Sequence, residues 1–147
     1  MTEKGVAQLM TVGELARRTG LSIKAIREYE GLGLIYSAGR SEGGYRLFDE
    51  SAMWCARVIG DLRAAGLTIK EIKRIGDAYL NHPDEPIGPQ IAAALDRSER
   101  RVDAKLAELH ALRRRIRCYR EDNAAALAGR RGADFAAQDP RRAQQIA

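Results

Sequence analysis

Apolar residues near the start of the chain recur at the three-to-four-residue spacing of an amphipathic helix. Thr11 stands just before this pattern and Glu14 follows three residues later, which is the arrangement of a capping box. The pattern predicts a first helix over about Val12–Thr19. We expect Gly20 to end it, because glycine adopts the left-handed conformation without a steric penalty.

A second helical pattern follows at once, with Ser22 as its expected cap and Gly31 and Gly33 as its end. The positions expected to face the core are Ile23, Ile26 and Tyr29. The positions expected on the opposite face are Lys24, Arg27 and Glu28. These long outer side chains would reach phosphates and base edges if the helix lay in a major groove of DNA.

The next segment has the pattern of a glycine-kinked hairpin. We predict strands at Leu34–Tyr36 and Tyr45–Phe48, joined by a tight turn at Gly43 and Gly44. The hairpin side chains suited to gripping phosphates or entering a minor groove are Arg40, Tyr45 and Arg46.

Two short helices followed by a basic hairpin are typical of a winged helix-turn-helix, which indicates DNA binding. Each part also has a plainer interpretation, because T-x-x-E caps are common and a glycine-rich hairpin is often only a turn. The order and spacing of the parts favour DNA binding over these. The predicted DNA-contacting residues are Lys24, Arg27, Tyr29, Arg40, Tyr45 and Arg46.

Two further helices are expected to complete the core of this domain, which we place at residues 11–80 after an N-terminal extension at 1–10. The first is expected to end at Gly66, and Thr68 is expected to cap the second. We expect Trp54 to pack in the core or just below the surface, with stacking against a drug as the alternative.

The proline-rich segment 81–90 predicts a linker. Apolar residues then follow a heptad spacing, which predicts a coiled-coil helix over 91–121. The small N-terminal domain cannot cover the apolar face of this long helix. We therefore expect a second copy of the helix to cover it in a homodimer. The predicted dimerisation residues are Ile91, Leu95, Val102, Leu109, Leu112 and Ile116. In the tail at 122–147 we expect fraying or disorder from Gly129 onward.

Composition agrees with one modest domain and an accessory helix. The 147 residues carry a formal net charge of +5, which suits a polyanionic partner but is a weak signal alone. Two cysteines, and no apolar run near the ~20 residues of a membrane span, argue against a disulfide-stapled or membrane chain. Without a signal-peptide core we expect the cytoplasm. Catalytic motifs are missing, and we expect no enzymatic activity.

The motifs TVGELARRTGLS, IREYEGLGLI, GGYRLFD and LRAAGLTIKEIK resemble the MerR family of bacterial transcription regulators. With the heptad helix, the resemblance covers roughly residues 10–121. Members usually carry Arg followed by two aromatic residues in the recognition helix, whereas this chain has Glu28 between Arg27 and Tyr29. The hairpin motif GYR matches the family as it stands.

The resemblance implies a mode of action. It implies an antiparallel dimer that binds an inverted repeat inside a promoter with an over-long spacer. The dimer would twist or bend that DNA and so change how RNA polymerase meets the two promoter elements.

The effector is left open by the sequence. Metal-sensing members place thiolates at the start of the dimer helix and just after it, where this chain has Gly88 and approximately Asn123, so we expect neither a thiolate metal site nor a cofactor. Cys118 lies among arginines; an idle cysteine is favoured, with a redox thiol, or a mixed site with His82 and His110, as alternatives. Any small-molecule site is expected between the coil and the DNA-binding domains.

Two other classes of function stay open. An architectural DNA-binding protein would show little sequence specificity and a steep loss of affinity with salt. A protein-interaction adaptor would act through the coil, and the basic hairpin speaks against it.

Overall fold

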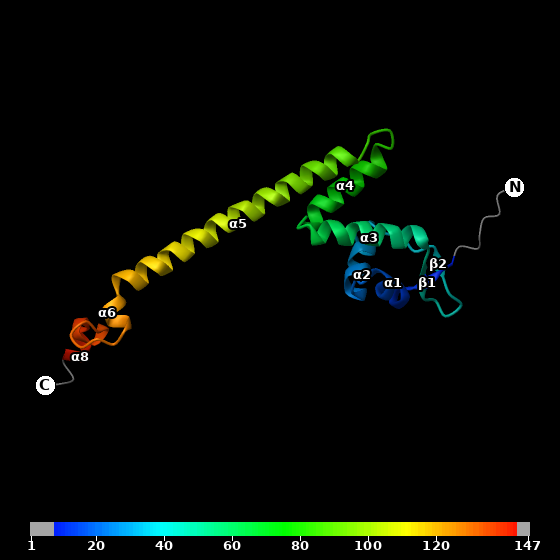
Figure 1. Cartoon of the computed structure of the whole chain (residues 1–147). Coiled ribbons are helices and arrows are strands. Elements are labelled where there is room, and N and C mark those ends of the chain that lie inside the picture. Colours follow the sequence, from blue (N-terminus) through cyan, green and yellow to red (C-terminus); the bar gives the residue numbers. More distant parts are fainter. Residues whose placement is uncertain (1–7, 144–147) are drawn as a thin grey trace. The chain divides into compact units, whose positions relative to one another are not determined.

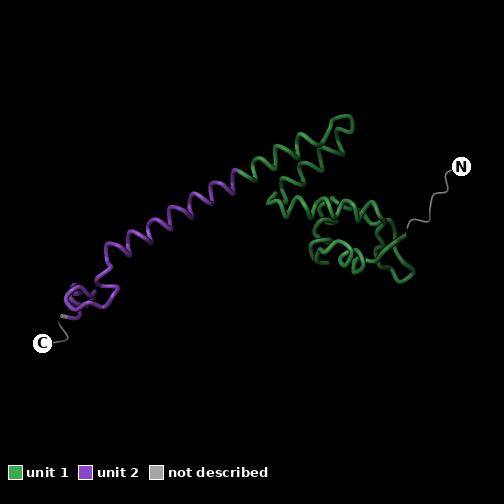
Figure 2. Tube along the Cα trace, viewed as in Figure 1, with its two compact units in different colours: residues 1–99 green, residues 100–147 purple. Residues whose placement is uncertain are grey.

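The computed structural model describes residues 8–143, which are mainly helical with one small sheet (Figure 1). The elements in chain order are β1 (Met10–Thr11), α1 (Val12–Thr19), α2 (Ile23–Gly31), β2 (Gly39–Arg40), β3 (Arg46–Phe48), α3 (Glu50–Ala64), α4 (Ile69–Asn81), α5 (Gly88–Asp122), α6 (Ala124–Leu127), α7 (Phe135–Gln138) and α8 (Pro140–Ala143). They fall into two compact units, residues 1–99 and residues 100–147 (Figure 2). The predicted fold class, a winged helix-turn-helix followed by a long helix, is confirmed.

Helices α1 and α2 begin where their polar caps predict. Thr11 Oγ1 accepts a hydrogen bond from the backbone N–H of Glu14 at 3.3 Å, and Ser22 Oγ accepts one from that of Ala25 at 3.0 Å. Gly20 ends α1 with a φ of 75°, in the left-handed region that favours glycine. The caps and this glycine fix the short turn between the two helices.

The sheet has three antiparallel strands in the order β1-β3-β2. Met10 lies opposite Phe48, and Gly39 lies opposite Leu47. The predicted strand at Leu34–Tyr36 is wrong, because pairing on that side begins only at Gly39. Strand β1 escaped prediction because two residues are too few to show a period of two.

The core of the first unit lies among β1, β3, helices α1 to α4 and the start of α5. Its largest fully buried side chains are Phe48, Met10, Leu15, Ile26, Ile35 and Leu67. Burial of Met10 makes the end of the predicted N-terminal extension part of this domain, while residues 1–7 lie outside the described residues.

Two apolar side chains contradict their predicted inward placement, since Ile23 is 41% exposed and Trp54 is 63% exposed. On α3 the buried face includes Met53 and Ala56, and Trp54 lies about 100° around the helix from Met53. Ile23 is the first residue of α2, and the core is filled one turn later by Ile26.

Helix α4 begins with a complete capping box between Thr68 and Glu71, as predicted for its start. The connection to α5 is short, and α5 begins at Gly88, earlier than the predicted start at 91. Ala94 is fully buried, and Ile91 packs partly buried against the chain's own core. Ile91 therefore packs within its own chain. We remove it from the predicted dimerisation residues, which then begin after it.

The first turns of α5 are also joined to the turn between α3 and α4 by polar contacts. Ser98 Oγ donates a hydrogen bond to the carbonyl oxygen of Ala65 at 2.7 Å, and the Ser98 residue is 4% exposed. Arg97 Nε lies 3.3 Å from Glu71 Oε1. This bond within the chain explains why a polar residue, Ser98, stands among the apolar positions of the heptad spacing.

In the second unit, α5 presents a row of large apolar side chains that are 48% to 55% exposed. The row consists of Val102, Leu106, Leu109, Leu112, Ile116 and Tyr119. Beyond it, the tail in which we expected fraying or disorder from Gly129 onward contains the short helices α7 and α8. Residues 144–147 lie outside the described residues.

Among residues 8–143, none of the helices combines the length and the hydrophobicity needed to span a bilayer.

Candidate nucleic-acid interface

The outer face of α2 carries the side chains that the sequence assigns to DNA. Lys24 and Arg27 are exposed there, while Ile26 holds the helix to the core from the other side. Tyr29, predicted both to face the core and to contact DNA, lies in the core with 5% of its surface exposed. Its predicted DNA contact is therefore corrected to a packing role, because the ring fills space beneath the helix.

The wing comprises residues 39–48, and the turn at its tip requires glycine. Gly44 has a φ of 81°, and its N–H donates to the carbonyl oxygen of Ser41 at 2.9 Å. This turn leaves Tyr45 74% exposed. Arg40 Nη1 donates to the carbonyl oxygen of Gly44 at 2.8 Å, so this guanidinium braces the turn while remaining exposed.

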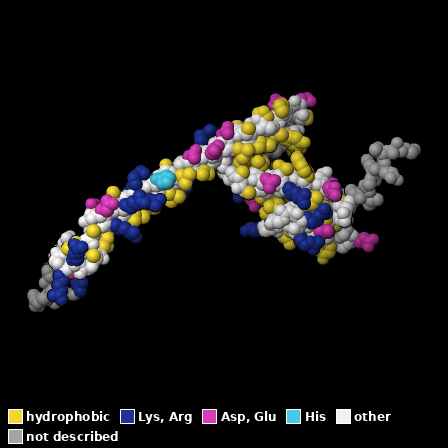
Figure 3. Space-filling model, viewed as in Figure 1, with side chains coloured by type: hydrophobic (Ala, Val, Ile, Leu, Met, Phe, Trp, Pro, Cys, Tyr) yellow, Lys and Arg dark blue, Asp and Glu magenta, His cyan; other side chains and the backbone are white. Residues whose placement is uncertain are grey.

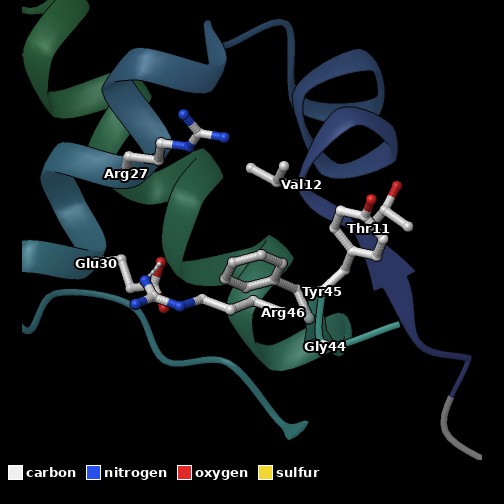
Figure 4. Close-up of a pocket in the computed structure, with 8 residues that line it drawn as sticks. Thr11, Val12, Arg27, Glu30, Gly44, Tyr45 and Arg46 are labelled. Atoms are coloured by element: carbon white, nitrogen blue, oxygen red, sulfur yellow. Dashed lines mark ion pairs between the residues drawn. The ribbon is translucent and has the colours of Figure 1, made fainter. Parts of the chain in front are cut away.

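A cleft of about 470 Å³ opens between α2, the start of α1 and the wing (Figure 4). The residues that line it are Thr11, Val12, Arg27, Glu30, Gly44, Tyr45, Arg46 and Phe48. Arg46 Nη1 lies 2.7 Å from Glu30 Oε2, and the Glu30 side chain is 13% exposed. Two arginines and one carboxylate leave the cleft with a net positive charge, which attracts a phosphate backbone.

The fold thus brings three of the six predicted DNA-contacting residues, Arg27, Tyr45 and Arg46, around one cleft. Lys24 and Arg40 are exposed but do not line the cleft. Sequence reasoning missed Glu30. It lies one turn after Arg27 on α2, but its pairing with the wing depends on tertiary structure that no local pattern carries.

Neither cysteine lies in this cleft. Burial, and then the nearby carboxylate of Asp49, raise the pKa of the Cys55 thiol above its usual range. Cys118 is exposed on α5. An idle cysteine stays the favoured interpretation there, and a redox thiol stays the alternative. Within residues 8–143, no group of three or more His, Cys, Asp or Glu side chains is placed to hold a metal ion.

A helix pair, a wing and a basic cleft between them define this chain as a winged helix-turn-helix protein. A family model described as MerR HTH family regulatory protein matches residues 10–78. An uncharacterized HTH-type transcriptional regulator of Pseudomonas aeruginosa is 30% identical over 104 residues, which cover 71% of this chain and 77% of that protein. The chain belongs to the MerR family of transcription regulators.

The chain is also similar to a further relative and to a solved structure. Nodulation protein NolA of Bradyrhizobium sp. (strain NC92) is 29% identical over 106 residues, covering 72% of this chain and 41% of NolA. The chain thus spans about two fifths of the length of that relative. Among solved structures, the transcription regulator PbrR691 from Ralstonia metallidurans in complex with lead(II) matches with a TM-score of 0.61 and 30% sequence identity. The match covers 80% of this chain and 86% of that chain.

Proposed function

We propose that this protein is a sequence-specific DNA-binding transcription regulator. It binds double-stranded promoter DNA with α2 in a major groove and the wing against the adjacent backbone. The cleft that joins Arg27 of α2 to Tyr45 and Arg46 of the wing carries this proposal. Exposed arginines suit both tasks, because a guanidinium reads guanine and grips phosphate in a fixed geometry.

The regulator acts as a homodimer. The exposed apolar row on α5 supports this, because a lone helix gains nothing by keeping such side chains in water. A two-fold dimer presents two copies of α2 to two half-sites, so the operator is an inverted repeat.

The protein regulates transcription by changing the shape of promoter DNA. It acts in the cytoplasm, and RNA polymerase is its partner at the promoter. Binding two half-sites with a stiff dimer twists or bends the DNA between them, and the cost of that deformation depends on sequence. Relatives named as transcription regulators support the placement at promoters. The protein acts by binding and not by catalysis.

The replacement Arg27→Ala tests the DNA contact. It removes a guanidinium from the outer face of α2, so we expect specific operator affinity to fall by ~1–3 kcal/mol. Operator affinity is measured by fluorescence anisotropy at fixed salt. Arg100→Ala, which removes an equal charge from an exposed site on α5, serves as the control. Equal losses in the two variants would contradict the role of Arg27.

A further inference from the structure

The positive charge of this chain lies in residues 100–147. They contain 12 Lys or Arg residues and six Asp or Glu residues, which gives a net charge of +6. Residues 1–99, which include α2 and the wing, contain 13 and 14 such residues and have a net charge of −1. Figure 3 shows Lys and Arg side chains, in dark blue, gathered on the half of α5 that leads to α6. The half of the chain outside the winged domain is therefore its basic half.

This charge is concentrated in one stretch of α5, residues 113–120, which we call the arginine segment. Five of its eight residues are arginines, and no Asp or Glu occurs between Glu108 and Glu121. The five, all exposed, are Arg113, Arg114, Arg115, Arg117 and Arg120. Within residues 8–143, none of the five forms an ion pair with its own chain. Earlier on α5, in contrast, Lys105 Nζ lies 3.0 Å from Glu108 Oε2.

Three of these arginines stay outside a dimer interface built on the apolar row. Successive residues of an α-helix are turned by about 100°. By this spacing Arg113, Arg114 and Arg117 lie about 80° to 180° from the middle of the row at this end of α5. The row there consists of Leu109, Leu112, Ile116 and Tyr119. A helix that covers the row therefore leaves these three guanidinium groups on the flank or the outer side of α5.

A second copy of the chain also lacks the charge to neutralise the arginine segment. If the two α5 helices run antiparallel, the start of the partner's helix faces the segment. Residues 88–108 contain four Asp or Glu and four Lys or Arg, so this stretch has no net charge. The connection before α5 adds only the carboxylates of Asp84 and Glu85, against five guanidinium groups. A parallel pair would place two arginine segments side by side. In both arrangements an excess of positive charge remains.

The arginines also repel one another. Arg113 and Arg117 are four residues apart, and Arg114 and Arg117 are three apart, so these side chains are neighbours on the helix surface. Like charges at these spacings destabilise a helix. An anion that bridges the guanidinium groups would remove this repulsion.

The density of the charges suits a phosphate backbone. Eight residues of helix are about 12 Å long, so the five charges follow one another at about 2.4 Å along the axis. Double-stranded DNA carries one charge per about 1.7 Å of its axis. A guanidinium holds a phosphate through two hydrogen bonds of fixed geometry. DNA is favoured among polyanions because α2 and the wing bring the chain to it, which raises its local concentration around the arginine segment.

We propose that Arg113, Arg114 and Arg117 bind the phosphate backbone of double-stranded DNA, without preference for sequence and separately from α2 and the wing. Each phosphate that they neutralise releases counterions, so the contact adds affinity that depends on salt. The choice of DNA as the polyanion rests on the proposed function, whereas the excess of charge does not.

The test is the affinity of the full chain for a random-sequence duplex, measured by fluorescence anisotropy over a range of salt concentrations. The variant carries Arg113→Gln, Arg114→Gln and Arg117→Gln together, because glutamine matches arginine in helix propensity. We expect affinity to fall by about tenfold or more. The slope of log affinity against log salt should become shallower by about two or more, since each phosphate contact contributes about 0.9.

The matched control carries Arg130→Gln, Arg131→Gln and Arg142→Gln together. These three arginines are also exposed and belong to the same unit, but they lie beyond α5. The control loses the same charge, and we expect its affinity to fall by about threefold or less. Circular dichroism and sedimentation equilibrium verify that both variants keep the helix content and the oligomeric state of the unaltered chain.

Three results would overturn the proposal. The first is an equal loss in the variant and the control, which would reduce the effect to net charge. The second is an unchanged salt slope in the variant. The third is tighter binding of polyglutamate, or of vesicles containing phosphatidylserine, than of the duplex, which would identify an acidic protein or a membrane as the partner. Operator-specific binding together with any of these would overturn this inference and leave the proposed function in place.

Discussion

Arg46 enters the cleft beside α2 with its guanidinium already held by Glu30 at 2.7 Å. The Arg46 side chain is 51% exposed, so one side of it stays open to DNA. A long arginine loses considerable rotamer freedom when it is ordered. Because Glu30 orders Arg46 in advance, less of that loss falls on DNA binding, and the guanidinium is aimed before contact.

Replacing Glu30 by Gln should therefore separate specific from non-specific binding. The variant frees Arg46, so we expect specific operator affinity to fall by ~0.5–1.5 kcal/mol, the cost of ordering one long side chain. It also removes a negative charge near phosphate, so affinity for random DNA should rise slightly. Both affinities are measured by anisotropy at the same salt concentration.

Glu42→Gln is the matched control, because Glu42 is exposed in the wing turn and the replacement changes the net charge equally. We expect Glu42→Gln to raise both affinities together. A Glu30→Gln variant that behaved in the same way would show that Glu30 acts only through its charge and does not position Arg46.

Single residues were predictable where a local pattern defines them. Arg27 and the wing pair Tyr45 and Arg46 follow from helix spacing and turn chemistry, and the structure places all three at one cleft. The exposure of Trp54 was not predictable, because hydrophobicity favours burial and only the packing of α3 leaves this ring outside. The partner of Glu30 likewise depends on tertiary structure.

At the scale of elements, the turn between α3 and α4 is closed by the start of α5. Gly66 in this turn has a φ of 85°, and a Cβ placed on it would lie 2.6 Å from Ser98 Oγ. The same Ser98 hydroxyl donates its hydrogen bond to Ala65. The turn therefore requires both a left-handed backbone and the absence of a side chain.

A double-mutant cycle tests this closure. Gly66→Ala should cost ~1–2 kcal/mol of unfolding free energy from the left-handed backbone alone, and more from contact with Ser98. Ser98→Ala should cost ~0.5–1.5 kcal/mol for its hydrogen bond. Because the second change removes the atom that the new Cβ meets, the double variant should lose less than the sum. Strict additivity in urea unfolding would contradict the proposed contact.

Elements were predictable where caps and periodicity are strong, as at Thr11, Ser22 and Thr68. The short strands were not, since β1 and β2 have two residues each and depend on pairing with β3. The heptad spacing predicted a long helix in this part of the chain, and α5 is that helix. It could not tell that Ile91 packs on its own chain, because a repeat pattern does not name the surface that covers it.

At the scale of the whole molecule, the exposed apolar row from Val102 to Tyr119 requires a partner, and we propose a second copy. Leu109, near its middle, is 52% exposed. We expect Leu109→Glu to raise the dimer dissociation constant by about tenfold or more, because it removes an apolar contact and places a charge in each half of the interface. Sedimentation equilibrium measures the change.

Ala107→Glu introduces the same side chain outside the apolar row and is the control. It should leave the dimer intact. A monomeric wild-type chain at micromolar concentration, or equal effects of the two replacements, would contradict dimerisation through this row.

The most direct test of the account is a footprint of the purified protein on the DNA upstream of its own gene, at physiological salt. We expect protection of one short inverted repeat between promoter elements, with enhanced reactivity at its centre where the DNA is distorted. Diffuse protection that disappears as salt is raised would contradict sequence-specific regulation and would favour an architectural DNA-binding protein instead.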